Sequence, residues 1–485
     1  MECALSRPNF LLFMPDQLRA DAVGAFGGPV ASTPAIDALA ARGVRFTNAF
    51  AQHSVCSPSR VSMFTGWYPH VAGHRTLTHL LKPWEPNLFR TLRDAGYHVA
   101  AAGLRGDLFA PGVSAGSVDR MGFQVPPTSF RDPLVPEGHP LRRAMYAGSR
   151  GADVVVDIDE ATTRTAEAWL AEGLPEPWLL FVPLVFPHPP FGAEEPWYSL
   201  HDRSRMPAPC PPKRGGEPRF MPALRDRLGT DALTDHWAEL AATYHGMVSR
   251  VDHQLGRLLG AVERAGAGDR TVTAFFTDHG EYLGDFGLVE KWPAGVDDCL
   301  VRNPLVMAGP GVASGGACGA MVEMVDLLPT LCELAEAEVA HTHFGRSLAD
   351  VLAEPGAPHR DPFSEGGFLV AEEHLLERAG GHYDYKGALQ HEDPRLVGRV
   401  TALRTPRWTY VRRLYEADEL YDRAADPQET TNLIGDPGHA AVVADLSGRL
   451  LDWLLETSDV VPWAPDPRFE PELVDLVLSA ARPRS

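Results

Sequence analysis

Residues 56–66 read Cys-Ser-Pro-Ser-Arg-Val-Ser-Met-Phe-Thr-Gly, and the rest of the chain is organised around this stretch. Pro58 suits the first turn of a helix, so Cys56 is expected near a helix N-terminus, in the positive potential of unpaired backbone N–H groups. Arg60, one turn further on, adds a fixed positive charge on the same side. Such a place favours an anionic nucleophile and an anionic substrate. The alternative is a buried structural cysteine ahead of a helix that Ser57 caps.

The segments before the cysteine predict a strand, a helix and a second strand. The apolar run 8–14 ends at Pro15-Asp16-Gln17 and is typical of a buried central strand. Asp16 and Gln17 would then lie just past its carboxyl end, where open α/β sheets bind their ligands. A helix is expected over 34–43 and a strand over 44–50, which leads to the cysteine.

The same alternation continues along the chain and predicts a mostly parallel sheet covered on both faces. Helices are expected over 86–95, 160–171 and 237–265, and strands over 97–102, 177–185 and 271–276. The segments 105–155 and 189–235 are rich in Pro, Gly and Arg and are interpreted as long loops.

After about residue 360 the pattern changes to that of a small antiparallel sheet. A hairpin is expected over 400–411, an extended segment at 419–422 and a helix over 438–456, followed by a Pro-rich tail of about thirty residues on the surface. We therefore predict two parts, a catalytic domain over 1–365 and a C-terminal subdomain over 366–485 with an antiparallel sheet, a helix and the tail.

Composition favours a soluble globular enzyme, with 44% hydrophobic and 22% charged residues among 485. The formal net charge of −20 argues against a nucleic-acid partner, because phosphate binding needs a basic surface. Residues 1–8 contain no apolar h-region, so no secretory signal peptide is expected, and no run of eighteen apolar residues in the sequence predicts a membrane span. Six scattered cysteines without a Cys-x-x-Cys pair predict a reduced, cytoplasmic protein.

A second polar site follows the predicted strand 271–276. Residues 277–291 read Thr-Asp-His-Gly-Glu-Tyr-Leu-Gly-Asp-Phe-Gly-Leu-Val-Glu-Lys. Asp278 and His279 would join Asp16 and Gln17 at the carboxyl edge of the sheet. Carboxylate and amide oxygens suit Ca²⁺ or Mg²⁺, whereas the imidazole keeps Mn²⁺ or Zn²⁺ possible. The structural alternative is that both pairs are ordinary turns.

The stretch 56–66 resembles the signature of the formylglycine-dependent type I sulfatases, near their arylsulfatase and phosphonate monoester hydrolase branch. The resemblance extends over residues 7–456 and includes Asp16-Gln17, Asp278-His279, Lys291, and the Asp-x-x-Pro-Thr pattern at 326–330. It implies an alkaline-phosphatase-like α/β sandwich. It also implies that Cys56 is oxidised to formylglycine by a formylglycine-generating enzyme, and that a hydroxyl of the hydrated aldehyde is the nucleophile.

The resemblance also implies roles for individual residues. One divalent metal ion, with Ca²⁺ preferred, would be held by Asp16, Gln17, Cys56, Asp278 and His279. Lys291 would bind sulfate oxygens, and His188 would donate to a sulfate oxygen or to the leaving oxygen. A further histidine would take the proton that releases sulfate; His74 is the candidate and His70 the alternative.

One segment departs from the family pattern. Many sulfatases carry a lysine after the strand that is expected to end near Ala102, but this chain reads Gly-Leu-Arg-Gly-Asp-Leu over 103–108. One alignment places Arg105 at the lysine position and the other places Leu104 there. If Arg105 is the second cation of the site, its planar fork would bind sulfate in a bidentate manner.

The sequence therefore predicts hydrolysis of a small-molecule sulfate monoester to an alcohol and inorganic sulfate. The first alternative is a phosphonate monoester or phosphodiester hydrolase with the same site, because a metal and a tetrahedral oxyanion centre serve both transfers. The remote alternative is an inactive homologue that only binds anions.

Overall fold

The computed structural model describes residues 7–103, 107–129, 133–356, 360–378 and 380–460. Its centre is an eight-stranded sheet in which only β9 runs antiparallel to its neighbours β2 and β8. The strands follow the order β10 (Gly316–Glu323), β2 (Val44–Phe50), β9 (Arg302–Ala308), β8 (Thr271–Phe276), β1 (Asn9–Asp16), β6 (Trp178–Pro187), β3 (His98–Ala102) and β4 (Arg120–Gly122).

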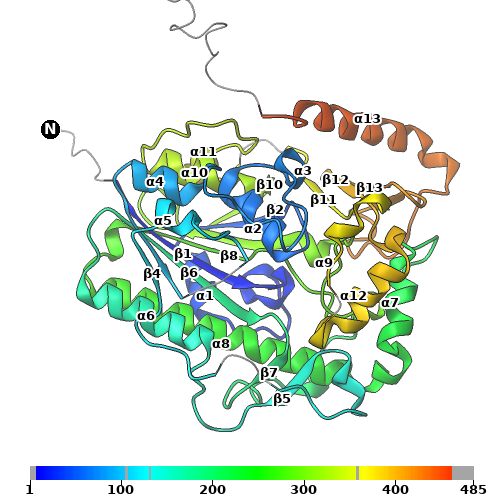
Figure 1. Cartoon of the computed structure of the whole chain (residues 1–485), viewed down its shortest axis with the longest axis horizontal. Coiled ribbons are helices and arrows are strands. Elements are labelled where there is room, and N and C mark those ends of the chain that lie inside the picture. Colours follow the sequence, from blue (N-terminus) through cyan, green and yellow to red (C-terminus); the bar gives the residue numbers. More distant parts are fainter. Residues whose placement is uncertain (1–6, 104–106, 130–132, 357–359, 379, 461–485) are drawn as a thin grey trace, which may run out of the picture.

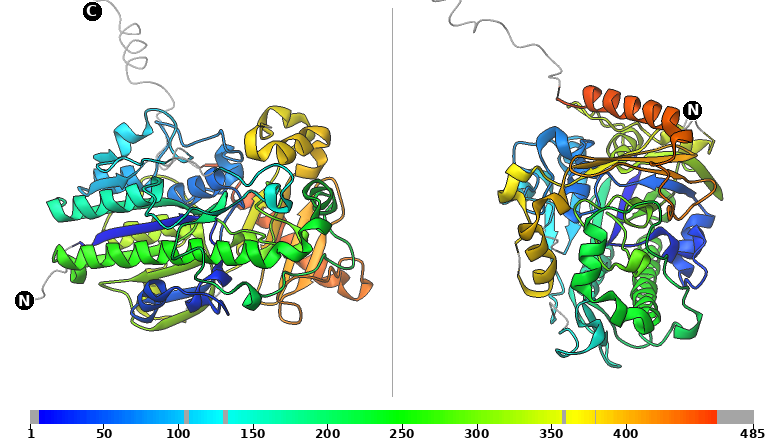
Figure 2. Two further views of the ribbon diagram at one scale, coloured as in Figure 1. Left: turned by 90° about the horizontal axis from the view of Figure 1, so that it is seen from below. Right: turned by 90° about the vertical axis from the view of Figure 1, so that its right-hand side faces the viewer.

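Helices cover both faces of this sheet (Figures 1 and 2). One layer consists of α1 (Pro34–Ala41), α6 (Ile158–Glu172) and α8 (Trp237–Arg264), with α8 in contact with the other two. The opposite layer contains α2 (Cys56–Thr65), α4 (Leu88–Asp94) and α10 (Leu327–Leu334), which contact one another. The short helices α5 (Val113–Ser117) and α11 (Ala349–Ala353) pack beside α4 and α10, and α3 (Pro69–Ala72) follows α2. This arrangement confirms the predicted sandwich.

The central strands form where the apolar runs predict them. All eight residues of β1 are buried, and it pairs in parallel with β6 on one side and β8 on the other. Strands β2 and β8 have the predicted bounds. Side chains cap two of the predicted helices, since Asn87 accepts from Arg90 N and Asp157 accepts from Glu160 N.

A smaller antiparallel sheet follows, in the order β11 (Phe363–Gly366), β12 (Val400–Arg404), β13 (Trp408–Arg413) and β14 (Glu419–Asp422). Helix α13 (Ala440–Glu456) packs on it through a second apolar core that includes Leu403, Tyr410, Leu420, Leu446 and Trp453. The sheet with its helix confirms the predicted C-terminal architecture. The proposed boundary at 365/366 falls inside β11, whose Ser364 hydroxyl donates to Ala51 O of the large part.

The two predicted loop regions contain short elements that the sequence pattern does not reveal. These are α5 and β4 in the first region, α7 (Phe220–Leu228) in the second, and a two-stranded sheet of β5 (Tyr146–Ser149) and β7 (Phe191–Ala193). Two more helices, α9 (Asp298–Val301) and α12 (Asp384–Glu392), lie near the carboxyl edge of the large sheet, and α12 packs against α7. The predicted surface tail lies outside the described residues. Among the described helices, none has the length and apolar character needed to cross a bilayer.

Candidate active site

Two neighbouring parallel strands deliver the acidic residues of the site. Strand β1 ends at Asp16, and β8 ends at Phe276, with only Thr277 between it and Asp278 and His279. The two strands pair in register from Asn9 opposite Thr271 to Phe13 opposite Phe275. Their carboxyl ends therefore meet, and the polar residues that follow them converge at one edge of the sheet.

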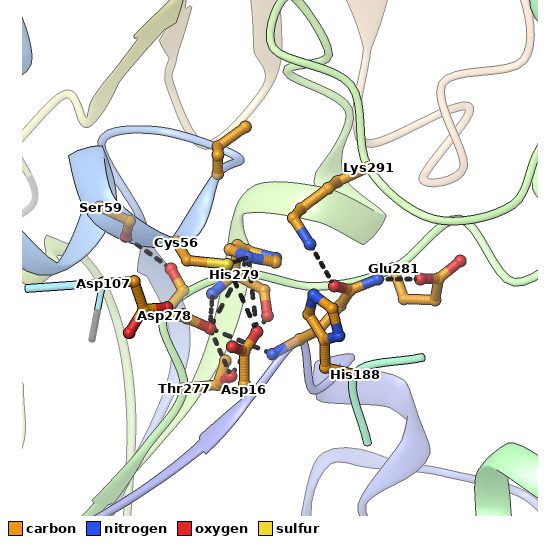
Figure 3. A network of polar contacts seen from close by, with 12 residues as sticks. Asp16, Cys56, Ser59, Asp107, His188, Thr277, Asp278, His279, Glu281 and Lys291 are labelled. Carbon is orange, nitrogen blue, oxygen red and sulfur yellow. Dashed lines mark hydrogen bonds and ion pairs between the residues drawn. The ribbon is translucent and has the colours of Figure 1, made fainter. Parts of the chain in front are cut away.

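Cys56 joins these residues from the first turn of α2. Ligand atoms of Asp16, Cys56, Asp278 and His279 all lie within 4.8 Å of one another, and the four side chains are buried (Figure 3). Cys56 Sγ is 3.2 Å from His279 Nε2 and 3.7 Å from Asp16 Oδ1. The cysteine thus faces the same small space as the two carboxylates and the imidazole.

Arg60 binds the carboxylates of Asp16 and Asp278 through the oxygens that face away from Cys56. Its Nη2 donates to Asp16 Oδ2 and its Nε to Asp278 Oδ2, both over 2.8 Å, and its Nη1 pairs with Asp107. The guanidinium is 1% exposed. Since Arg60 contacts the Oδ2 atoms, the Oδ1 atoms of Asp16 and Asp278 are turned toward Cys56 and His279. In this structure Arg60 orients the carboxylates.

The imidazole of His279 is oriented so that one ring nitrogen could bind a metal ion. Its Nδ1 is 2.9 Å from Gly280 O, which makes Nδ1 the protonated nitrogen and leaves the lone pair of Nε2 facing the cluster. Burial lowers the pKa of His279 to about 4, so the ring is neutral at pH 7. Two carboxylate oxygens and one neutral imidazole nitrogen form a donor set that fits a divalent cation.

Gln17 borders the cluster but its side chain is engaged elsewhere. Its backbone N–H donates to Asp278 Oδ1 over 3.1 Å. Its side-chain amide donates to Glu281 and accepts from Lys291 Nζ over 2.5 Å. As a metal ligand, Gln17 would share its carbonyl oxygen between Lys291 and the ion.

The thiol of Cys56 is held in its neutral form. Burial raises its pKa to about 12, and the carboxylates of Asp278 and Asp107 add to this effect, whereas Lys291 and Arg60 oppose it. The expected positive potential is outweighed because Arg60 is already paired with three carboxylates. An unmodified Cys56 is therefore a poor nucleophile with these residues alone, since the thiolate is the reactive form.

Lys291 and His188 border the cluster on the side away from Asp107 (Figure 3). Lys291 is buried and also pairs with Glu290 over 2.6 Å. His188 follows β6, with Nδ1 2.7 Å from Pro189 O and Nε2 3.5 Å from the hydroxyl of Tyr383. A cavity of about 400 Å³ opens beside His188 and is lined partly by Phe186, Pro190 and Tyr383.

The remaining candidates have different surroundings. His74 is buried, with Nδ1 2.8 Å from His79 O and Nε2 3.1 Å from Glu85 Oε1. His70 pairs with Glu365 and with Thr457. Neither contact set includes a residue of the four-residue cluster. Leu104 and Arg105 lie outside the described residues.

The structure adds side chains for which the sequence predicts no role. Glu281 and Glu290 belong to the motif at 277–291, and their contacts with Gln17 and Lys291 bring them to the site. Lys386 comes from α12 and contacts Glu290. Only a tertiary structure could show this contact, because the two residues are 96 positions apart. Ser59 and Asp107 also contact the site, through Asp278 O and Arg60 respectively.

A mostly parallel sheet between two helical layers, with carboxylates, an imidazole and a cysteine at its carboxyl edge, defines a hydrolase of the alkaline-phosphatase-like superfamily. The chain belongs to the sulfatase family, whose model matches residues 8–337. A second model, for the C-terminal part of N-sulphoglucosamine sulphohydrolase, matches residues 284–455.

Curated relatives span nearly the whole chain. A multifunctional alkaline phosphatase superfamily protein from Trinickia caryophylli is 28% identical, with 94% of this chain and 96% of the relative covered. A Delta 4,5-hexuronate-2-O-sulfatase from Bacteroides thetaiotaomicron is 26% identical, with 94% and 90% covered. Among solved structures, the phosphonate monoester hydrolase of Agrobacterium radiobacter superimposes with a TM-score of 0.72 at 26% identity, covering 93% of this chain and 96% of that one.

Proposed function

We propose that this protein hydrolyses a sulfate monoester to an alcohol and inorganic sulfate, with formylglycine made from Cys56 supplying the attacking hydroxyl. The observation that carries the proposal is the position of Cys56 at the start of α2, 3.2 Å from His279 Nε2 and within the cluster of Asp16 and Asp278. The neutral thiol supports a need for modification, because a buried thiol with a pKa of about 12 is inert at pH 7.

Asp16, Asp278 and His279 would hold one divalent ion, with Gln17 and the formylglycine made from Cys56 as further proposed ligands. Ca²⁺ is the first choice from the two carboxylates. Such an ion would polarise the sulfate oxygens and lower the pKa of a bound hydroxyl. Arg60 keeps the Oδ1 atoms of the carboxylates turned inward, and Lys291 donates to a sulfate oxygen. His188 donates to the leaving oxygen at the mouth of the cavity.

His74 is the less favoured candidate for the base in sulfate release, because it contacts His79 and Glu85 and no residue of the four-residue cluster. Arg105 is kept as a candidate second cation. The maturation partner would be a formylglycine-generating enzyme. Cytoplasmic localisation remains a prediction from the cysteine pattern.

A phosphonate monoester or phosphodiester hydrolase is the second candidate. It is favoured by the Asp16-Gln17 and Asp278-His279 pairs, and by the structural similarity to a phosphonate monoester hydrolase. A carboxylate, imidazole and lysine site around one ion serves both kinds of ester.

The first test is the mass of the peptide that contains Cys56, from protein produced together with a formylglycine-generating enzyme. A loss of about one water mass relative to cysteine is expected. The same preparation is then assayed on 4-nitrophenyl sulfate and on 4-nitrophenyl phenylphosphonate. A higher kcat/KM on the sulfate supports the proposal, a higher value on the phosphonate supports the second candidate, and an unmodified Cys56 removes the proposed nucleophile.

A further inference from the structure

Two buried lysines share the carboxylate of Glu290 at the edge of the site. Lys291 Nζ donates to Glu290 Oε1 over 2.6 Å, and Lys386 Nζ pairs with Glu290 Oε2. Lys386 also donates to the backbone carbonyl of Lys291. The three side chains are 8%, 1% and 4% exposed for Lys291, Glu290 and Lys386. Helix α12 of the C-terminal part therefore reaches the immediate neighbour of a proposed sulfate-binding residue.

The contacts continue from Lys291 toward the metal-binding carboxylates. Lys291 Nζ also donates to Gln17 Oε1, and the Gln17 amide donates to Glu281. Glu281 in turn accepts from the backbone N–H of Glu290, which closes a ring of buried polar groups. Gln17 and Glu290 have φ angles of 66° and 69°, in the left-handed region that non-glycine residues rarely adopt. Such conformations persist where surrounding contacts hold them, and they concentrate at functional sites.

The charges of this group explain why a second lysine is present. A buried Lys291–Glu290 pair alone would be neutral and would attract an anion weakly. Burial alone would raise the pKa of Glu290, but Lys291 and Lys386 hold it well below its usual range, so this carboxylate is ionised. Within the trio of Lys291, Glu290 and Lys386, two ammonium groups face one carboxylate, so the trio carries one excess positive charge.

The donors of Lys291 indicate how that charge is used. An ammonium group carries three N–H donors. Within the described ranges, the side-chain contacts of Lys291 with Glu290 and Gln17 account for two of them. The third donor is available to an oxygen of an anionic substrate bound at Cys56, which belongs to the same site (Figure 3).

We propose that Lys386 is a positioning residue for sulfate binding, which acts through Glu290 to keep the Lys291 ammonium oriented and its positive charge uncompensated. This inference rests on the proposed function. Lys386 is buried behind Glu290, so its effect on the Lys291 ammonium passes through that carboxylate.

The test compares Lys386→Met, which removes the charge and keeps most of the length, with Lys386→Arg, which keeps the charge. The control is Lys213→Met, because Lys213 is an equally buried lysine paired with Asp297, outside this network. Readouts are kcat and KM on the sulfate ester, the inhibition constant of inorganic sulfate, and the midpoint of thermal unfolding. For Lys386→Met we expect inorganic sulfate to bind roughly tenfold more weakly, the loss typical of one charge-assisted hydrogen bond. Lys386→Arg should keep most of the wild-type affinity for inorganic sulfate. Lys213→Met should lower the midpoint of thermal unfolding without weakening sulfate binding.

A double variant tests the route through Glu290. If Lys386 acts through this carboxylate, adding Lys386→Met to Glu290→Gln causes no further loss of sulfate affinity. If Lys386→Met alone does not fold, the comparison of Glu290→Gln with the double variant still tests whether Lys386 acts through Glu290. A further tenfold loss in the double variant, or unchanged sulfate inhibition in folded Lys386→Met, overturns the inference. Wild-type protein that binds inorganic sulfate but hydrolyses no sulfate ester would contradict the proposed function instead.

Discussion

The Sγ of Cys56 lies 3.2 Å from Nε2 of His279, although the two residues come from different elements 223 positions apart. The contact joins the first turn of α2 to the segment that follows β8, so the proposed site of modification and a proposed metal ligand lie side by side. Cys56 is buried, and its sulfur lies within 4.8 Å of ligand atoms of Asp16, Asp278 and His279.

Replacing this sulfur tests the nucleophile. Cys56→Ala is expected to lower kcat by at least about 10³-fold, the scale seen when a nucleophile is removed. The free energy of unfolding should change by only about 1 kcal/mol, because the side chain is small. The measurements are turnover of 4-nitrophenyl sulfate and the thermal midpoint. Cys56→Ser is a weaker test, because serine keeps a hydroxyl, and full activity of the alanine variant would refute the mechanism.

Arg60 is predicted to control metal binding. Arg60→Met leaves Asp16 and Asp278 buried without their shared cation, which should cost about 3–5 kcal/mol of stability in the metal-free protein. Their Oδ1 atoms would also lose their orientation, so we expect less bound metal after purification. Atomic emission spectrometry measures the metal content per protein, and chemical denaturation measures the free energy of unfolding. Arg60→Lys should be intermediate, because lysine keeps the charge but lacks the fork. Wild-type metal content in Arg60→Met would contradict this role.

The two candidate histidines should respond differently to substitution. His188→Gln is expected to lower kcat by about 10²-fold or more for esters with poor leaving groups, and less for 4-nitrophenyl sulfate, because a good leaving group needs no proton. His74 contacts His79 and Glu85, so His74→Gln should lower the thermal midpoint with little change in kcat. A large loss of kcat in a stable His74→Gln variant would instead support His74 as the base for sulfate release.

The free energy of unfolding should decrease at acidic pH, and His245 should account for part of this decrease. Burial lowers the pKa of His245 to about 4, with His201 and Arg19 acting in the same direction and Asp21 opposing them. The folded state therefore binds fewer protons than the unfolded state between about pH 6.5 and 4, and the free energy of unfolding decreases as pH falls through this window. The contribution of His245 is roughly 3 kcal/mol.

Denaturant unfolding of wild type and His245→Gln from pH 7.5 to 5 checks this expectation. Over this pH range the variant should lose stability less steeply than the wild type. Parallel slopes for wild type and His245→Gln would show that His245 does not contribute.

The sequence by itself determined the sandwich and the members of the cluster. Apolar runs that end in Asp16-Gln17 and in Asp278-His279 are local patterns, and parallel strands bring their carboxyl ends to one edge whatever their separation in the chain. The helix at Cys56 is equally local, because Pro58 and the residues around it set where it begins. The short elements α5, α7 and β5 were not predicted, because the segments around them are rich in Pro and Gly and show little hydrophobic periodicity. Packing against the rest of the fold stabilises them.

Only the tertiary structure decided which partner each buried charged side chain has. Arg60 was expected to add a fixed positive charge on the side of Cys56, but its guanidinium pairs with carboxylates 44, 47 and 218 positions away. Lys386 carries no local signal, and its role depends on α12 bringing it to Glu290. The physical reason is that the periodicity of a sequence determines which elements form and which faces they bury. The partner of a buried charge is chosen by the packing of distant segments, because each buried charge must find a counter-charge wherever the fold supplies one.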